Sequence, residues 1–325
     1  MSRILTTSLV FICLLFLQAC GQPSSDKSNQ SSQAAEDENA VPQIGLVMKS
    51  LANEFFVNMA EEAKAHQAKH SQMYSLIVNG TKNESDLAQQ VALIDQMIAS
   101  GVDAIVIAPA DSKAVVPAIV RALKAGITVV NIDNRLDEQA LSDYGVSVPF
   151  VGPDNKAGAR MAAEFAASRL NEGDPVIVLE GIPSAINSQQ RVAGFMEAIN
   201  SANLNLVARQ SADWEQTKAA QVSASLLIQH PETTAIFAAN DNMALGALAA
   251  VQRANLSDSI LIVGFDNINA IQSHIESGDV LVTVDQFGGQ LAVFGIEKAL
   301  AALEGQSLDA ITQTPLELIT ASAAD

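Results

Sequence analysis

The stretch Ala235-Ile-Phe-Ala-Ala-Asn-Asp-Asn-Met-Ala-Leu-Gly246 decides the fold. A short apolar run stops at the polar side chains of residues 240–242, and an Ala- and Leu-rich helical pattern follows. This order predicts a buried strand, a polar loop and a helix. In open α/β sheets the loops after parallel strands converge on one crevice, where ligands bind. The stretch therefore predicts an α/β fold with a ligand site at the strand ends.

The same order of an apolar run and polar residues recurs along the chain. Further strands are expected at 43–48, 104–107, 128–132, 260–264 and 281–284. These runs are almost continuously apolar, as in parallel strands that helices cover on both faces. Polar side chains follow them at Asn53, Asp133, Asp266 and Gln286. We therefore expect two doubly wound parallel-sheet lobes, with a binding cleft between them.

Residues 1–20 have the features of an export signal, with Arg3, an apolar run from Leu9 to Leu17 and a small-residue cleavage site. The sequence Leu17-Gln-Ala-Cys20 resembles a bacterial lipobox, which would make Cys20 the lipidated first residue of the exported chain. An ordinary signal peptide with an incidental Cys is the alternative. Residues 21–41 are too polar to bury themselves and are expected to form a disordered tether. The protein would then be periplasmic or at the cell surface, with a lipid as its sole membrane anchor.

The chain of 325 residues has a formal net charge of -18. Binding to a nucleic acid backbone needs clustered Lys and Arg, and the sequence contains no basic run. An acidic surface is typical of soluble proteins that stay monomeric. The composition therefore argues against a nucleic acid partner and favours a monomer.

The sequence contains no Gly-rich phosphate loop, no nucleophile-turn motif and no metalloprotease motif. His66 and His70 could form a metal pair, but no Cys or carboxylate motif accompanies them, so we expect a solvated helix face. Asp133, Asp266 and Asp285 could supply carboxylates for acid–base catalysis. Because no nucleophile, metal or cofactor motif accompanies them, we favour ligand binding over an enzyme and expect no cofactor and no metal.

The polar and aromatic residues near the strand ends suit a sugar. Each sugar hydroxyl both donates and accepts hydrogen bonds, which carboxylates, guanidinium groups and amides can satisfy together. Aromatic rings can pack on the C–H faces of a sugar ring. Phe55, Phe56, Trp214 and Phe265 all lie beside expected polar loops, and Trp214 stands between two acidic residues. These features favour a small polar ligand with several hydroxyl groups.

Four motifs carry a resemblance to a known family: Asn53-Glu-Phe-Phe56, Arg191-Val-Ala-Gly-Phe195, the stretch from Ala239 to Ala247, and Val263-Gly-Phe-Asp266. With these motifs the chain resembles the periplasmic sugar-binding proteins of the ribose-binding type, the substrate receptors of ABC importers. The resemblance implies two lobes joined by a hinge with three crossovers. It implies a first lobe of residues 42–152 and 287–313 and a second lobe of residues 153–286 and 314–325.

The resemblance also implies a set of ligand-binding residues drawn from both lobes. They are Asn53, Phe55, Phe56, Asp133, Asn134, Arg191, Trp214, Asn240, Phe265, Asp266 and Gln286. Phe56 and Trp214 are expected to sandwich the sugar ring. For Asp111 and Asn155 we expect helix capping instead, because Asp and Asn are common caps. Asp241 and Asn242 are likewise expected to be loop and cap residues.

The chain departs from the family pattern at several of these positions. Lys49 stands where a small hydroxyl residue is expected, Ala108 where an amide is expected, and Asn134 where an Arg is expected, with Arg135 one residue later. These changes predict a ligand other than ribose. The resemblance implies an ABC permease of the inner membrane as partner, and a membrane histidine kinase or chemoreceptor is the alternative. A repressor with the same body would need a DNA-binding segment where residues 1–41 stand.

Overall fold

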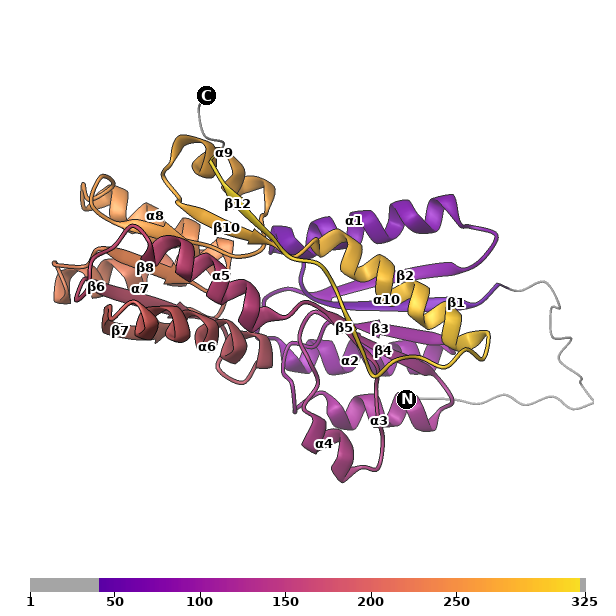
Figure 1. Cartoon of the computed structure of the whole chain (residues 1–325). Helices are drawn as coiled ribbons and strands as arrows, with labels where there is room; N and C mark the ends of the chain where they lie inside the picture. The colour runs from indigo at the N-terminus through magenta and orange to yellow at the C-terminus, as the bar shows by residue number, and fades with distance from the viewer. Residues whose placement is uncertain (1–40, 322–325) are drawn as a thin grey trace, which may run out of the picture. The chain divides into compact units, whose positions relative to one another are not determined.

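The computed structural model describes residues 41–321. The expected signal segment, Cys20 and the tether up to Ala40 lie outside this range. The described residues form two six-stranded sheets, each with helices on both faces (Figure 1). None of the helices in this range is long and apolar enough to span a membrane.

The first sheet has the order β11-β5-β4-β3-β1-β2, and all of its strands are parallel. Its strands are β1 (Gln43–Ser50), β2 (Ser75–Thr81), β3 (Ala104–Ile107), β4 (Thr128–Ile132), β5 (Phe150–Gly152) and β11 (Ile311–Gln313). Its helices are α1 (Glu54–Lys69), α2 (Leu87–Ser100), α3 (Val116–Lys124), α4 (Glu138–Asp143) and α10 (Gly288–Leu303). We refer to these elements as the first lobe.

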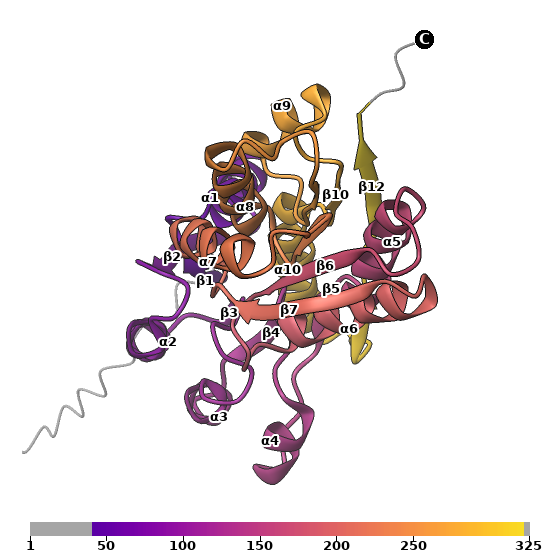
Figure 2. The same cartoon turned by 90° about the vertical axis from the view of Figure 1, so that its left-hand side faces the viewer.

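The second sheet has the order β12-β10-β9-β8-β6-β7, in which β12 is antiparallel to β10. Its strands are β6 (Pro175–Glu180), β7 (Asn205–Ser211), β8 (Ala235–Ala238), β9 (Leu261–Val263), β10 (Val282–Asp285) and β12 (Glu317–Thr320). Its helices are α5 (Asn155–Ala167), α6 (Ile186–Ser201), α7 (Gln216–Gln229), α8 (Asp241–Arg253) and α9 (Asn269–Ser277). In this second lobe α5 packs against α6, and α7 packs against α8 (Figure 2).

Strand β3 shows why both faces of the sheets are covered. Its four residues are all buried, and they alternate between two apolar clusters. Ala104 and Val106 belong to the cluster that includes α1 and α10, whereas Ile105 and Ile107 belong to the cluster that includes α2 and α3. Successive side chains of a strand point to opposite faces, so a strand covered on both faces is apolar throughout.

Three connections join the lobes. The chain passes from β5 to α5, returns from β10 to α10, and passes again from β11 to β12. Helix α10 packs against α1 and β4, and β12 pairs with β10. The expected crossovers and the two-lobe α/β fold are therefore confirmed. The boundaries at residues 152, 286 and 313 stay a prediction, supported by the sheet to which each strand belongs.

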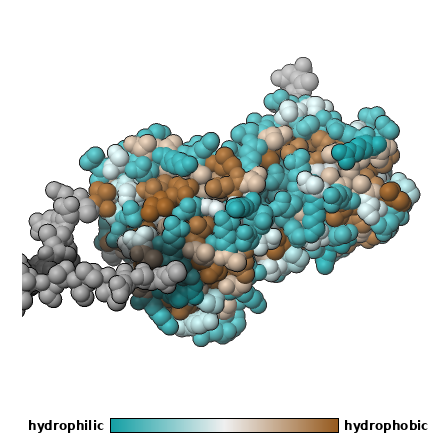
Figure 3. All heavy atoms as spheres, turned by 180° about the vertical axis from the view of Figure 1, so that it is seen from behind, coloured by the Kyte–Doolittle hydropathy of each residue, from teal (hydrophilic) through white to brown (hydrophobic). Residues whose placement is uncertain are grey.

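On the face shown in Figure 3, hydrophilic residues cover much of the surface, with small groups of hydrophobic residues between them. Large apolar side chains that are exposed, such as Met73, Tyr144 and Ile228, lie far apart in the sequence. Isolated exposed apolar residues are normal on a soluble protein. Polar and charged side chains are, in contrast, buried where the strand ends of the two lobes face each other.

Candidate ligand-binding site

A small cavity lies between the carboxyl ends of the strands of the two sheets, where parallel α/β sheets bind ligands. Side chains from both lobes line it, and all of them are buried or nearly so. They are Lys49, Asn53, Phe55, Phe56, Glu84, Asp133, Asn187, Arg191, Trp214, Asn240, Asp266 and Gln286.

Arg191 of α6 organises the second-lobe wall of the cavity. Its Nε donates to Asn155 Oδ1 at 2.8 Å, and its Nη1 donates to Ala239 O at 2.8 Å and to Asp266 Oδ1 at 3.1 Å. Its guanidinium also lies over the Phe265 ring, 3.8 Å from the ring centroid. These three hydrogen bonds and the ring contact fix the orientation of the planar guanidinium. Its remaining N–H donors therefore point in one direction.

Asp266 follows β9 with a φ of 121°, a backbone conformation that is rare for a residue with a side chain. Its carboxylate accepts from Arg191 and from Gln286 Nε2, the latter at 2.7 Å. Burial raises the pKa of Asp266, and the positive charge of Arg191 opposes that rise. Backbone strain of this kind often marks functional sites.

Trp214 and Asn240 complete the second-lobe wall. Asn240 is the N-cap of α8, because its Oδ1 accepts from Met243 N at 2.9 Å. Its Nδ2 lies 3.4 Å from Trp214 O. The Trp214 ring packs so closely on Gly181 that a Cβ there would lie 2.1 Å from ring atoms. The ring is therefore fixed at the cavity by its neighbours.

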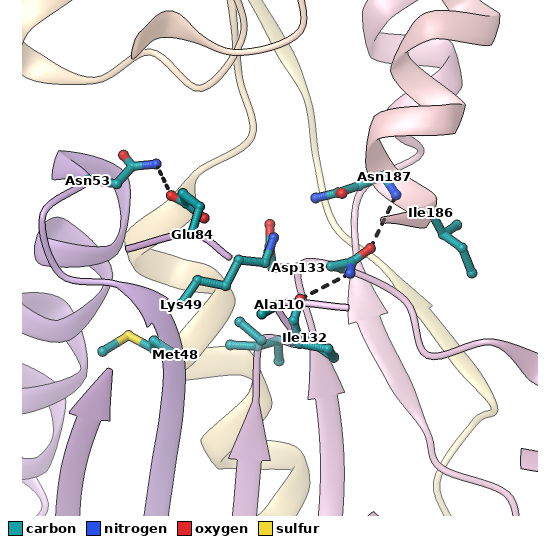
Figure 4. Close-up of polar contacts among 12 residues, drawn as sticks. Met48, Lys49, Asn53, Glu84, Ala110, Ile132, Asp133, Ile186 and Asn187 are labelled. Atoms are coloured by element: carbon teal, nitrogen blue, oxygen red, sulfur yellow. Dashed lines mark hydrogen bonds and ion pairs between the residues drawn. The ribbon is translucent and has the colours of Figure 1, made fainter. Parts of the chain in front are cut away.

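The first-lobe wall carries an unexpected set of charges. Lys49 Nζ pairs with Asp133 Oδ2 at 2.9 Å, and both side chains are about 3% exposed. Asn53 Nδ2 donates to Glu84 Oε1 at 2.7 Å. Figure 4 shows Lys49 at the end of β1, extending toward Asp133, with Asn53 and Glu84 pointing toward each other.

Glu84 makes no ion pair within 4 Å among the described residues, and Lys49 acts on it from a longer distance. Burial raises its pKa to about 7, and the charges of Asp133 and Glu215 act in the same direction. The ammonium of Lys49 and the hydrogen bond from Asn53 oppose this rise. Since Lys49 is shared by two acids, Glu84 can exchange a proton near neutral pH.

Two aromatic rings face the ammonium of Lys49. Its Nζ lies 5.5 Å from the centroid of the Phe56 ring and 6.0 Å from that of the Trp214 ring. Phe55 contacts Phe56 edge to face, with 5.1 Å between the ring centroids. The expected pair of rings, one from each lobe, is thus present at the cavity.

The structure brings the predicted ligand-binding residues together, except for Asn134 and Phe265, which do not line the cavity. Asn134 is fully buried and bonds to Pro109 O, Ser112 Oγ and Asn187 N. It points away from the cavity because Asp133 has a left-handed backbone, with φ 60°, that turns the next residue aside. Phe265 lies beneath Arg191 as its supporting ring.

Several other expectations change with the structure. Asp111 accepts from Lys113 N and Ala114 N in the turn before α3, whose N-cap is Val115, so the expected helix cap is not formed. The cap of α5, however, is Asp154, and Asn155 instead holds Arg191. Asn240 is the cap of α8, whereas Asp241 accepts from Thr283 Oγ1 and Ile268 N.

The structure also places His66, which was expected on a solvated helix face, and Arg135, which stands one residue after the expected arginine. His66 does not face solvent freely, because its Nδ1 lies 2.8 Å from the hydroxyl of Tyr74. Arg135 does not replace the expected arginine at the cavity. It pairs with Glu138 at 3.3 Å and lies over the Phe150 ring, away from the cavity lining.

Sequence reasoning missed three polar residues as cavity lining: Lys49, Glu84 and Asn187. Sequence signals could have found two of them, Lys49 and Asn187. Lys49 lies at the end of a buried strand, as Asp133 does, and Asn187 lies one helical turn before Arg191 on the same face of α6. Glu84 follows β2 by three residues in an irregular loop, and nothing in its sequence context indicates burial.

Comparison with known proteins gives a consistent result. Residues 44–307 match the model of the periplasmic binding protein domain. Over 284 residues the chain is 50% identical to a protein of Pseudomonas aeruginosa named D-ribose/D-allose-binding protein, covering 86% of this chain and 89% of the relative.

Two solved structures are similar as well. A solute-binding protein of an ABC transporter from Burkholderia multivorans is 46% identical, with a TM-score of 0.84 over 86% of this chain and 100% of the other. A periplasmic solute-binding protein of an ABC transporter from Actinobacillus succinogenes, with bound D-allose, is 35% identical, with a TM-score of 0.81 over 86% of this chain and 97% of the other. With this fold, this arrangement of strand ends and these relatives, the chain belongs to the periplasmic binding protein family.

Proposed function

We propose that this protein is the solute-binding receptor of an ABC importer and that it binds a monosaccharide or a related polyol between its lobes. The observation that carries this proposal is a set of buried polar atoms at the cavity. Asn187 Oδ1, Gln286 Oε1 and Trp214 Nε1 are buried and have no hydrogen-bond partner within the described residues. An unsatisfied buried polar group costs about 1 to 3 kcal/mol, so these atoms call for a ligand.

The chemistry of these atoms favours a hydroxylated ligand. Two of them accept hydrogen bonds and one donates, and a hydroxyl group can serve either kind. The charged groups of Arg191, Asp133 and Asp266 add stronger hydrogen bonds to the same ligand. Phe56 and Trp214 supply rings for the C–H faces of a sugar. Each class of side chain at the cavity thus has a counterpart on a monosaccharide.

The names of the similar proteins indicate which sugars to test first. The Pseudomonas aeruginosa relative is named for D-ribose and D-allose, and the Actinobacillus succinogenes structure contains D-allose. Because Lys49 in place of a small hydroxyl residue changes one hydroxyl partner of a ribose site, we place D-allose ahead of D-ribose as the first ligand to test. The similar structures are described as ABC transporter proteins, which supports import over signalling through a membrane sensor.

The cellular setting follows from the same reasoning. The protein acts in the periplasm as a monomer and presents its closed, sugar-bound form to an inner-membrane permease. Its lipid anchor is Cys20, which the lipobox sequence supports. It binds its ligand without transforming it, and the names of the relatives as binding proteins support this role.

Isothermal titration calorimetry with pentoses, hexoses and polyols tests the proposal. We expect at least one of them, with D-allose the first choice, to bind with a Kd in the micromolar range or below. Because Trp214 is the one tryptophan of the chain, its fluorescence should change on binding. Silence across the whole panel would contradict the proposal, and binding with unchanged emission would remove Trp214 from the site.

A further inference from the structure

Three helices of the second lobe, α6, α7 and α9, begin without a capping side chain of their own, and two of them, α6 and α9, receive acceptors from the first lobe. Ala185 precedes α6 and Ile268 precedes α9, and neither side chain has an oxygen atom for the first amides of its helix. Such amides need an acceptor. Other helices of the protein carry their own Asn or Asp cap, at Asn53, Asp86, Asp137, Asp154 and Asn240.

First-lobe side chains provide the acceptors for α6. Ile186 N donates to Ser112 Oγ at 3.0 Å, and Asn187 N donates to Asn134 Oδ1 at 3.2 Å. Ser112 and Asn134 are at most 1% exposed and are joined by a hydrogen bond of 3.3 Å. Asn134 is fixed in the first lobe, since its Nδ2 donates to Pro109 O at 3.0 Å. The two acceptors therefore form one rigid cap that belongs to the opposite lobe.

Glu54, the first residue of α1, provides the acceptors for α9. Its two carboxylate oxygens accept from Asn269 N at 3.1 Å and from Ala270 N at 3.2 Å. The carboxylate thus lies at the N-termini of two helices, α1 in the first lobe and α9 in the second. A negative charge is favourable at each of these ends.

Both contacts adjoin the cavity. Glu54 follows the lining residue Asn53, Asn134 follows Asp133, and Asn187 is itself a lining residue. All four amides belong to the second lobe and all three accepting side chains to the first. A hinge opening of the usual two-lobe kind would separate every one of these donor–acceptor pairs.

We propose that Glu54, Ser112 and Asn134 are closure residues, which cap α6 and α9 across the cleft when the lobes are closed and so hold the closed form around bound sugar. This inference rests on the proposed function. Helices α6 and α9 gain these capping hydrogen bonds when the lobes close. The bonds therefore contribute to the free energy of ligand binding. Asn134 then affects ligand affinity through the position of Asn187 and without touching the ligand.

Variants Glu54→Ala and Ser112→Ala test the inference, with Glu61→Ala on the exposed face of α1 and Ser142→Ala on α4 as matched controls. The probe is D-allose or D-ribose, whichever the unmodified protein binds more tightly. We expect each closure variant to raise the dissociation rate about fivefold, the size of effect of losing one good helix cap. The association rate should change much less.

A second measurement separates closure from simple stabilisation of the fold. The melting temperature of the ligand-free variants should stay near that of the controls, while the rise that sugar produces should be smaller. Equal dissociation rates in closure variants and controls would overturn the inference. So would an equal loss of stability with and without sugar, since that result indicates caps that are always in place.

Failure of the proposed function would look different. If the unmodified protein binds none of the sugars tested, the proposed function fails, and hydrogen exchange of the ligand-free protein still decides the inference. Fast exchange of the Asn269 and Ala270 amides, equal in the ligand-free unmodified protein and in ligand-free Glu54→Ala, supports caps that form only on closure. Strong protection of these amides without ligand that is lost in Glu54→Ala and kept in Glu61→Ala would show that the caps are always in place, and would contradict the inference.

Discussion

The two walls of the cavity are built in different ways. On the second-lobe wall, Arg191 and Asp266 balance each other and are tied to their own lobe by hydrogen bonds to Asn155, Ala239 and Gln286. On the first-lobe wall, a single cation, Lys49, faces two acids, Asp133 and Glu84. The second wall is preorganised, whereas the first holds a charge imbalance that a ligand or a proton can change.

This difference suggests a division of labour in recognition. A rigid, balanced network provides hydroxyl contacts without cost of reorganisation, as binding sites for any sugar require. On a wall with unequal numbers of cations and acids, each ligand leaves a different charged group without a partner. Because a buried unpaired group is costly, such a wall discriminates between ligands. We therefore expect the second wall to set the strength of binding and the first wall to set the choice of sugar.

The largest effect is expected from Arg191→Met, which breaks the second-wall network. Asp266 would remain buried without its cation, and the loss of one partner of a buried pair costs about 3 to 5 kcal/mol of stability. Binding of every sugar should weaken at least 100-fold. Urea denaturation and calorimetry measure these effects.

Arg209→Met, which removes an exposed pair with Glu180, is the control and should cost less than about 1 kcal/mol. Similar losses in both variants would show that the second wall is not a network.

A smaller effect is expected from Lys49→Met on the first wall. The change removes the cation of that wall, and we expect a loss of about 3 kcal/mol of stability, because Asp133 then stays buried without its ion-pair partner. The order of preference among D-allose, D-ribose and other sugars should change in this variant. Competition titrations measure that order. An unchanged order, with all affinities lowered equally, would contradict the division between the walls.

The free energy of unfolding should depend on pH because the first-lobe wall holds two acids and one cation. Glu84 has a pKa near 7 in the folded protein, above its ordinary value of 4.5, so the folded state binds more protons between these pH values. Stability is therefore highest below the ordinary value and falls as pH rises through 7, by about 3 kcal/mol for this group. Burial raises the pKa of Asp241 to about 6 and also raises that of Asp266, which adds to the fall.

Glu84→Gln isolates the part of this slope that belongs to the first wall. The variant should lose less stability than the unmodified protein between pH 5 and pH 8, as thermal melts across this range would show. Glu172→Gln, at an exposed position, should leave the slope unchanged. Identical slopes in Glu84→Gln and the unmodified protein would mean that Glu84 does not hold its proton in the fold.

The fold could be predicted from the sequence because its signals are local. Apolar runs such as Ala104 to Ile107 mark buried parallel strands, and polar residues directly after them lie at the cavity, as Asp133 and Asp266 do. The direction in which the side chain after such a residue points cannot be predicted from the local sequence. Asn134 turns away from the cavity because of the backbone at Asp133, and no sequence pattern gives that dihedral angle.

Contacts between residues that are far apart in the sequence could not be predicted from the sequence pattern either. Asn155 was expected to cap a helix, yet it holds Arg191, which lies 36 residues later. Glu54 reaches Asn269 across 215 residues, and no capping signature near α9 points to it. Glu84 gives no sign of burial, because a charged residue in an irregular loop is usually exposed. The second wall was therefore predicted better than the first, where Lys49 and Glu84 were missed.

The smallest effect concerns Asn240, which serves the fold and the cavity at once. Its Oδ1 caps α8 and its amide lines the cavity, so Asn240→Ala should lower stability by about 1 kcal/mol and also weaken binding. Ser is an equally good N-cap with a shorter side chain. Asn240→Ser should therefore keep the stability of the unmodified protein within about 0.5 kcal/mol while still weakening binding. Urea denaturation and calorimetry on both variants separate the two roles. If Asn240→Ser binds sugar as tightly as the unmodified protein does, Asn240 acts through the helix cap alone, and the second wall has one hydroxyl contact fewer than we propose.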